Sequence, residues 1–116
     1  MILDFEDREE NGVTVVEVEG KLTTTSSPEA DAYLKELLDE GTTKLLLNLE
    51  GVDFIASTGL RVILATGKTL MATGGKLVLC SLNPTVADVF RMSGFSQMFD
   101  VFDTEAEGLD LSLIHI

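Results

Sequence analysis

At the start of the chain, apolar and polar residues alternate with the two-residue period of a β-strand. Residues 13–19 are rich in β-branched side chains, alternate in part and end at Gly20, and this pattern predicts a strand. Asn11-Gly12 comes directly before it and is a strong signal for a two-residue hairpin turn. Residues 2–7 are therefore expected to form an antiparallel partner strand.

Beyond this hairpin, short apolar runs alternate with longer stretches in which apolar residues recur every three or four positions. The short runs predict strands, and a continuous apolar run is typical of a strand covered on both faces. These strands are expected at residues 44–49, 76–80 and 98–102. The longer stretches predict amphipathic helices. They are expected between Ser27 and Gly41, between Ser57 and Gly74, between Asn83 and Gly94, and from Thr104 onward.

Residues that favour the first turn of a helix support these boundaries. Pro28 loses no hydrogen bond at the first helical position, and the Ser27 hydroxyl can cap the free amides there. Asn83 is expected to cap the third helix in a similar way. At the start of the second helix, we expect the hydroxyl of Ser57 or Thr58 to be the cap.

The elements follow in the order β-β-α-β-α-β-α-β-α. A chain of 116 residues has the length of one domain. We therefore predict a single α/β domain with a mixed sheet of about five strands and four helices, in which helices connect the parallel strands. The domain is expected to span residues 3–110, and residues 111–116 form an apolar tail of uncertain origin to which we assign no function.

The charge balance argues against several classes of partner. Eight Lys and Arg residues stand against twenty Asp and Glu residues, so the formal net charge is −12. Direct nucleic-acid binding is not expected, because it needs clustered cations to neutralise phosphates. No apolar run approaches the roughly 18 residues of a membrane span, and the first residues lack the pattern of a signal peptide. We expect a cytoplasmic protein without membrane insertion.

The residue types needed for catalysis or metal binding are scarce. Cys80 is the only cysteine, so no disulfide can form within the chain, and its apolar run predicts a core position. His115 is the only histidine and lies one residue from the C-terminus. Ser57 is not in a Gly-x-Ser-x-Gly motif, and no glycine-rich loop matches a phosphate-binding motif. We expect no catalytic residue, no metal and no cofactor, and therefore no enzyme.

One segment combines features that suit a regulated contact. A short loop after the strand at 44–49 delivers Ser57 and Thr58 to the start of an amphipathic helix. Gly59 keeps the first turn free of a side chain, so that a partner can approach closely. The free amides of that turn can donate hydrogen bonds to a phosphate. The plainer interpretation is that a hydroxyl here only caps the helix, and the two interpretations are compatible.

Several short segments of this sequence match, in the same order, segments of a known domain family. The first comprises Asn48-Leu49 and the run from Phe54 to Leu64. An early block is Gly20-Lys21-Leu22-Thr23, and later blocks lie at residues 74–77 and 90–95. Together they resemble the STAS domain, the family of bacterial anti-sigma factor antagonists, over about residues 3–110.

The resemblance implies a partner-switching mechanism. The unmodified antagonist binds an anti-sigma factor that is also a serine kinase, and a sigma factor is released, so that transcription starts. The kinase phosphorylates one hydroxyl at the start of the second helix, which ends the interaction, and a PP2C-type phosphatase resets the protein. The acceptor position corresponds to Ser57. The partner-binding surface is expected to comprise Thr23, Thr24, Thr25, Ser57, Thr58, Gly59 and Arg61, with Arg61 solvated in the free protein.

Two positions depart from the family's pattern. Many phosphorylated members have Asp immediately before the acceptor, where this chain has Ala56, and many have Asp in the early turn, where it has Thr23. Those carboxylates lie near the acceptor in the family, so the departures bear on kinase recognition and on the rate of phosphorylation. The alternative function is that of a STAS scaffold in a signalling assembly, or of an accessory subunit of a lipid or anion transporter.

Overall fold

A computed structural model describes residues 3–110 of the chain, apart from the side chain of Ser96. The strands are β1 (Leu3–Glu10), β2 (Val13–Leu22), β3 (Lys44–Ile55), β4 (Lys76–Cys80) and β5 (Asp100–Phe102). The helices are α1 (Ser27–Asp39), α2 (Ser57–Ala72), α3 (Pro84–Ser93) and the single turn α4 (Glu105–Gly108), and a 3₁₀ turn covers Phe95–Gln97. The predicted α/β class and order of elements are confirmed, whereas the tail at 111–116 lies outside the described residues.

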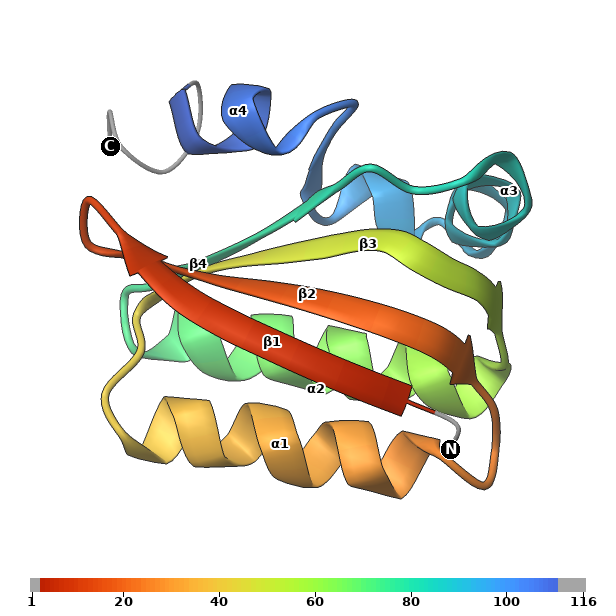
Figure 1. The fold of residues 1–116 in the computed structure, drawn as a ribbon, viewed down its shortest axis with the longest axis horizontal. Coiled ribbons are helices and arrows are strands. Elements are labelled where there is room, and N and C mark those ends of the chain that lie inside the picture. The colour runs from red at the N-terminus through yellow and green to blue at the C-terminus, as the bar shows by residue number, and fades with distance from the viewer. Residues whose placement is uncertain (1–2, 111–116) are drawn as a thin grey trace.

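The strands form one mixed sheet in the order β1-β2-β3-β4-β5. Asn11 and Gly12 both have positive φ, 53° and 83°, as the predicted two-residue hairpin requires. β1 is therefore antiparallel to β2, whereas the later strands run parallel to their neighbours. Because parallel neighbours need a crossover connection, a helix separates them in sequence, and β2 and β3 end at the same end of the sheet (Figure 1).

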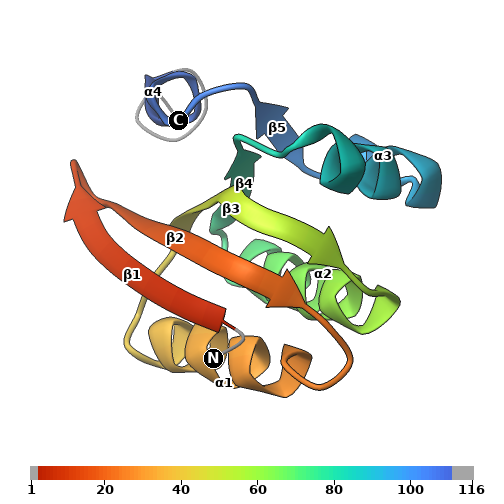
Figure 2. The ribbon, with the colours of Figure 1, turned by 45° about the vertical axis from the view of Figure 1, so that its right-hand side comes forward.

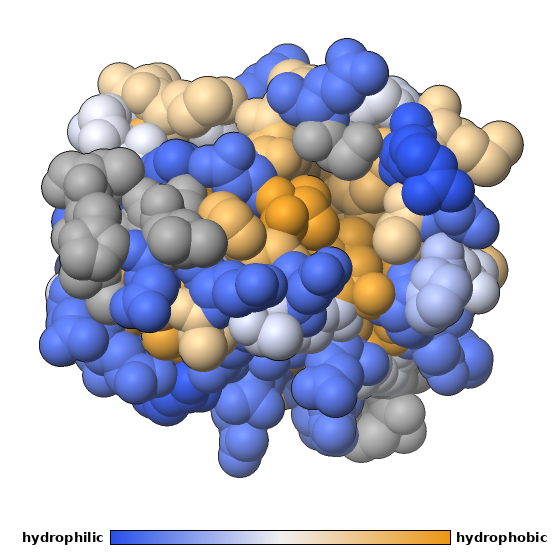
Figure 3. All heavy atoms as spheres, turned by 90° about the horizontal axis from the view of Figure 1, so that it is seen from above, coloured by the Kyte–Doolittle hydropathy of each residue, from blue (hydrophilic) through white to orange (hydrophobic). Residues whose placement is uncertain are grey.

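Helices cover both faces of the sheet. α1 and α2 lie side by side on one face, and α4 lies on the other (Figures 1 and 2). Alternate residues of a strand point to opposite faces, so Leu45 and Leu47 enter the main core, whereas Leu46 enters a smaller cluster with Val78 and Cys80. On the side of α3 and α4, apolar surface gathers in the middle of the face, and polar side chains surround it (Figure 3).

The main correction concerns β3, which runs to Ile55 and not to residue 49. The added segment contains exposed polar residues, but Val52 and Ile55 are buried. It pairs with the end of β2 across two irregularities in register. Only Ala56 therefore separates the strand from α2, and the expected loop is absent.

The two edge strands also differ in length from the prediction. β1 extends to Glu10, because the hairpin ladder continues to the turn and pairs Glu10 with Val13. The predicted start of this strand, Ile2, lies outside the described residues. β5 is shorter than expected and begins at Asp100, because the 3₁₀ turn occupies residues 95–97.

The reactivity of Cys80 tests its core position. The side chain is fully buried, as predicted, and burial raises the pKa of the thiol to about 11, because the thiolate is disfavoured away from water. At pH 8 we expect the folded protein to react with a thiol reagent such as DTNB at least about tenfold more slowly than the urea-unfolded protein, since the thiolate is the reactive form. Equal rates would contradict a buried thiol.

Candidate functional site

The candidate site lies where β2 and β3 end side by side. Leu22 and Ile55 are the last residues of the two strands, and they are paired in the parallel ladder. The Ala56 amide then donates a hydrogen bond to the Leu22 carbonyl oxygen (2.7 Å). The chain leaves both strands at the same place, so the turn before α1 lies beside the start of α2 (right-hand end in Figure 1).

Hydroxyl groups hold the turn at residues 23–26 in shape. The Thr23 amide donates to Ser26 Oγ (2.8 Å), and the Ser26 amide donates to Thr23 Oγ1 (3.1 Å). The Ser26 hydroxyl donates in turn to the Lys21 carbonyl oxygen (2.7 Å). Ser26 is buried, so these bonds replace the water that its polar atoms have lost. Thr24 and Thr25 project from this braced turn and are exposed.

A second pair of hydroxyls joins the turn to α2. Ser27 is buried, and its hydroxyl donates to the Thr23 carbonyl oxygen (2.6 Å). Its Oγ lies 3.2 Å from Thr58 Oγ1, at hydrogen-bond distance. The expectation that Ser27 caps α1 is wrong, because the N-cap position is Ser26, without a side-chain cap bond, and Ser27 is already helical.

α2 begins without a side-chain cap. Its N-cap residue is Ala56, with extended backbone (φ −89°, ψ 168°). The expectation that Ser57 or Thr58 caps the helix is wrong, since Ser57 is the first helical residue and β3 reaches almost to the helix. Within residues 3–110, the backbone amides of residues 57–59 have no hydrogen-bond acceptor. The first turn also lacks an acidic residue, so the positive end of the helix dipole is uncompensated.

Gly59 lies on the inner side of the first turn of α2 and is buried. A Cβ atom at this position would lie 3.1 Å from Leu22 Cβ and 3.1 Å from Ile55 Cγ1. The absent side chain therefore lets α2 pack against the ends of β2 and β3. The expectation that Gly59 leaves room for a partner is wrong, because this side of the turn points into the domain.

Ser57 and Arg61 lie on the outer side of α2, and both are exposed. They are four residues apart and are therefore neighbours on one helix face. Within residues 3–110, the Ser57 hydroxyl makes no hydrogen bond and the Arg61 guanidinium makes no ion pair. The expectation that Arg61 is solvated is confirmed.

The seven residues expected at a partner surface thus have three different environments. Four side chains are exposed at this end of the domain: Thr24, Thr25, Ser57 and Arg61. Thr23 and Thr58 are half-buried and take part in the hydroxyl contacts. Gly59 contributes to packing inside the domain.

A shallow, mostly apolar groove of about 280 Å³ lies between the starts of α1 and α2. It is lined by Thr24, Ser27, Pro28, Asp31, Thr58 and Val62. Sequence analysis did not assign Ser26, Ser27 or Val62 to the site. The unbroken run of hydroxyl residues at 23–27 was a usable signal for the first two. No local signal marks Val62, because its place beside α1 depends on how the helices pack.

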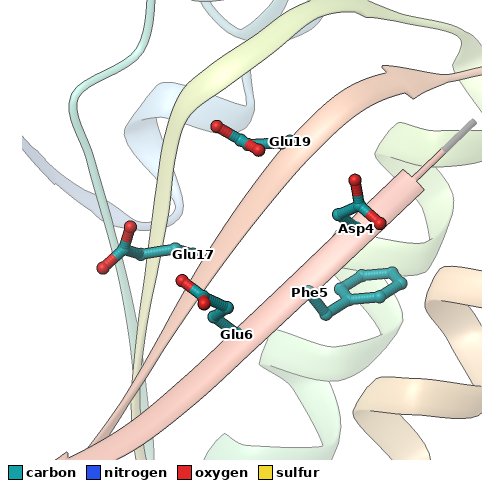
Figure 4. A pocket seen from close by; sticks show the side chains of 5 residues that line it. All are labelled: Asp4, Phe5, Glu6, Glu17 and Glu19. Carbon is teal, nitrogen blue, oxygen red and sulfur yellow. The ribbon is translucent and has the colours of Figure 1, made fainter.

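A larger hollow of about 340 Å³ lies on the outer face of the hairpin. Four carboxylates line it, and Phe5 points to the other side of the sheet (Figure 4). They come from facing positions of β1 and β2: Asp4 with Glu19, and Glu6 with Glu17. The lining residues include no hydroxyl, thiol or imidazole that could act as a nucleophile or as its base.

Metal ligands and membrane spans were also sought in the described part of the chain. Among residues 3–110, no cluster of three or more His, Cys, Asp or Glu residues is placed to hold a metal ion. In the same range, no helix combines the length and the apolar character needed to cross a bilayer.

Comparison with known proteins identifies the family. The family model of the STAS domain matches residues 4–108, and the chain belongs to the STAS-domain family. It is 36% identical over 91 residues to BtrV of Bordetella bronchiseptica, named as an anti-sigma factor antagonist, with 78% of each chain covered. It is 29% identical over 110 residues to an anti-sigma F factor antagonist of Paenibacillus polymyxa, with 94% of each chain covered.

Solved structures give the same result. The chain is similar to the anti-sigma factor antagonist SpoIIAA in its unphosphorylated form, with a TM-score of 0.79 and 25% identity over 92% of this chain and 94% of that one. It is also similar to SpoIIAA of Bacillus in its phosphorylated form, with a TM-score of 0.72 and 25% identity over 92% and 97% of the two chains. The resemblance inferred from the sequence is confirmed.

The contact between Ser27 and Thr58 can be tested through stability. Ser27→Ala removes a buried hydroxyl and should lower the free energy of unfolding by about 1 kcal/mol. Thr58→Val should have a similar effect, and the double variant should lose less than the sum, because both changes remove the same bond.

Ser57→Ala is the matched control for these variants. Its hydroxyl is exposed and does not cap the helix, so we expect a change below about 0.5 kcal/mol. Urea unfolding followed by circular dichroism measures all four variants. Strictly additive effects of the Ser27 and Thr58 changes would show that the two hydroxyls do not interact.

Proposed function

We propose that this protein is an anti-sigma factor antagonist. It binds an anti-sigma factor that is also a serine kinase, and the sigma factor held by that kinase is released. The observation that carries this proposal is the exposed Ser57 hydroxyl at the uncapped start of α2. Support comes from the family and from similar proteins that are named anti-sigma factor antagonists.

Phosphorylation of Ser57 ends the interaction. Ser57 Oγ attacks the γ-phosphorus of ATP bound to the kinase, the bond from that phosphorus to the β,γ-bridging oxygen breaks, ADP leaves, and the hydroxyl proton passes to a base of the kinase. The product carries a charge of about −1.5 to −2 at pH 7 on the contact surface. The similar protein SpoIIAA has a phosphorylated form, which supports this assignment.

Ser57, and not its neighbour Thr58, suits the role of acceptor. The Ser57 side chain is exposed and makes no hydrogen bond within residues 3–110, so a kinase can reach it without breaking a native contact. Thr58 is half-buried, and its hydroxyl contacts the buried hydroxyl of Ser27. Phosphorylation of Thr58 would separate this pair and force a charged group toward the groove between α1 and α2.

The kinase binds the exposed side chains at this end of the domain. Thr24 and Thr25 project from the braced turn, and Ser57 and Arg61 project from α2 beside it. Because Ala56 and Thr23 replace the family's common carboxylates, the kinase recognises this surface without either charge. The groove between the starts of α1 and α2 adjoins this surface and gives the kinase an apolar recess to contact.

The other parts of the proposed cycle lie outside the chain. A PP2C-type phosphatase removes the phosphate and restores binding, and the protein works in the cytoplasm. It acts by binding and not as an enzyme.

Incubation with the cognate kinase and ATP should add one phosphate, and it should be on Ser57. Peptide mass spectrometry locates the modified residue. The Thr58→Val variant is the matched control, because it keeps Ser57 and should still be modified once. A phosphate on Thr58 alone, or none with a proven cognate kinase, would contradict the assignment.

Ser57→Ala and Ser57→Asp should behave in opposite ways. The Ala variant keeps its fold, binds the kinase and is never released by phosphorylation, because it lacks the acceptor. The Asp variant also folds, since a carboxylate is favourable in the first turn of a helix. However, the carboxylate adds a negative charge to the contact surface, and this charge loses water when the kinase binds. It should weaken binding at least about tenfold, or roughly 1.4 kcal/mol, mainly through faster dissociation.

Titration calorimetry against the anti-sigma kinase measures this difference for the two variants and the unaltered protein. Circular dichroism of each free variant separates a binding defect from a folding defect. Equal affinities of a folded Asp variant and the unaltered protein would show that charge at the start of α2 is not the switch.

A further inference from the structure

The charges on α2 differ from those of the chain as a whole. The formal net charge of the chain is −12, yet residues 57–72 contain no Asp or Glu and carry only Arg61 and Lys68. Five of the eight cations form ion pairs: Arg8, Lys21, Lys35, Lys76 and Arg91. Arg61 forms none with residues 3–110. Its guanidinium is therefore free to bind an added anion.

The position of Arg61 relative to Ser57 suits such a bond. Four residues of helix correspond to a rise of about 6 Å, and both side chains are exposed on the outer side of α2. An anion that precedes its cation by four residues is the more favourable order of an ion pair on a helix. The planar guanidinium also matches the geometry of phosphate oxygens, to which it can donate two parallel hydrogen bonds.

We propose that Arg61 binds the phosphate of phosphorylated Ser57 within the same helix. The inference rests on the proposed function, in which Ser57 is the acceptor. Phosphorylation then has two effects on the surface that the kinase contacts, because it adds an anion and also occupies the nearby cation. The local charge changes from +1 to between about −0.5 and −1.

The test uses protein in which phosphoserine is incorporated at position 57 during translation, so that no kinase is needed. The second ionisation of the phosphate, near pH 6 for phosphoserine, is followed by ³¹P NMR at an ionic strength of about 0.1 M. The guanidinium favours the dianion, so Arg61→Gln should raise the pKa of the phosphate by about 0.2–0.4 unit. The helix dipole acts on both proteins equally and leaves this difference unchanged.

Lys68→Gln is the matched control. It removes one positive charge from the same helix, but Lys68 lies eleven residues from Ser57, a rise of about 16 Å. That distance exceeds the Debye length of about 10 Å at 0.1 M salt. At that ionic strength the pKa of the phosphate in the Lys68→Gln variant should stay within about 0.1 unit of its value in the unaltered phosphoprotein. Circular dichroism verifies that both variants are folded.

The Nε–Hε resonance of Arg61 gives a second readout. It should shift between the unmodified protein and the phosphoprotein, and the shift should shrink in 0.5 M NaCl, because salt screens an exposed pair. An equal phosphate pKa in Arg61→Gln, Lys68→Gln and the unaltered phosphoprotein would overturn the proposal. Since the phosphate is built in, that result would leave Ser57 as a kinase target, and a failed kinase assay would leave this pairing intact.

Discussion

The parallel pairing of β2 with β3 is the constraint on which the site depends. It brings Leu22 and Ile55 to the same end of the sheet, and the Ala56 amide continues the contact by one residue. Gly59 then allows α2 to pack directly on both strand ends. A hydroxyl turn and a helix start that are more than thirty residues apart in sequence therefore form one surface.

α2 also differs from α3 in the way it begins. The Asn83 side chain accepts a hydrogen bond from the Val86 amide and caps α3, whereas the amides of the first turn of α2 have no such acceptor within residues 3–110. The Ser57 hydroxyl also makes no hydrogen bond with any of residues 3–110. A covalent change at this hydroxyl can therefore alter the surface charge while the packing beneath it, at Gly59 and Leu60, stays intact.

Short sequence patterns predicted much of this fold. The remaining features depend on how strands pair and helices pack. The positive φ angles of Asn11 and Gly12 follow from the residue types at a two-residue turn, and the family block located Ser57. The extension of β3 carries a mixed pattern, because its strand character comes from contact with β2. The inward position of Gly59 and the contact between Ser27 and Thr58 depend on how helices and strands pack together, which no short segment encodes.

The acidic hairpin bears on how copies of the protein meet in a crowded solution. β1 is an edge strand of eight residues with five carboxylates and one guanidinium, and edge strands are templates for pairing with another chain. A second copy aligned along β1 would bring two such rows of charge within about 5 Å. At the opposite edge, β5 offers only three residues. Repulsion at one edge and shortness at the other oppose growth of the sheet from copy to copy.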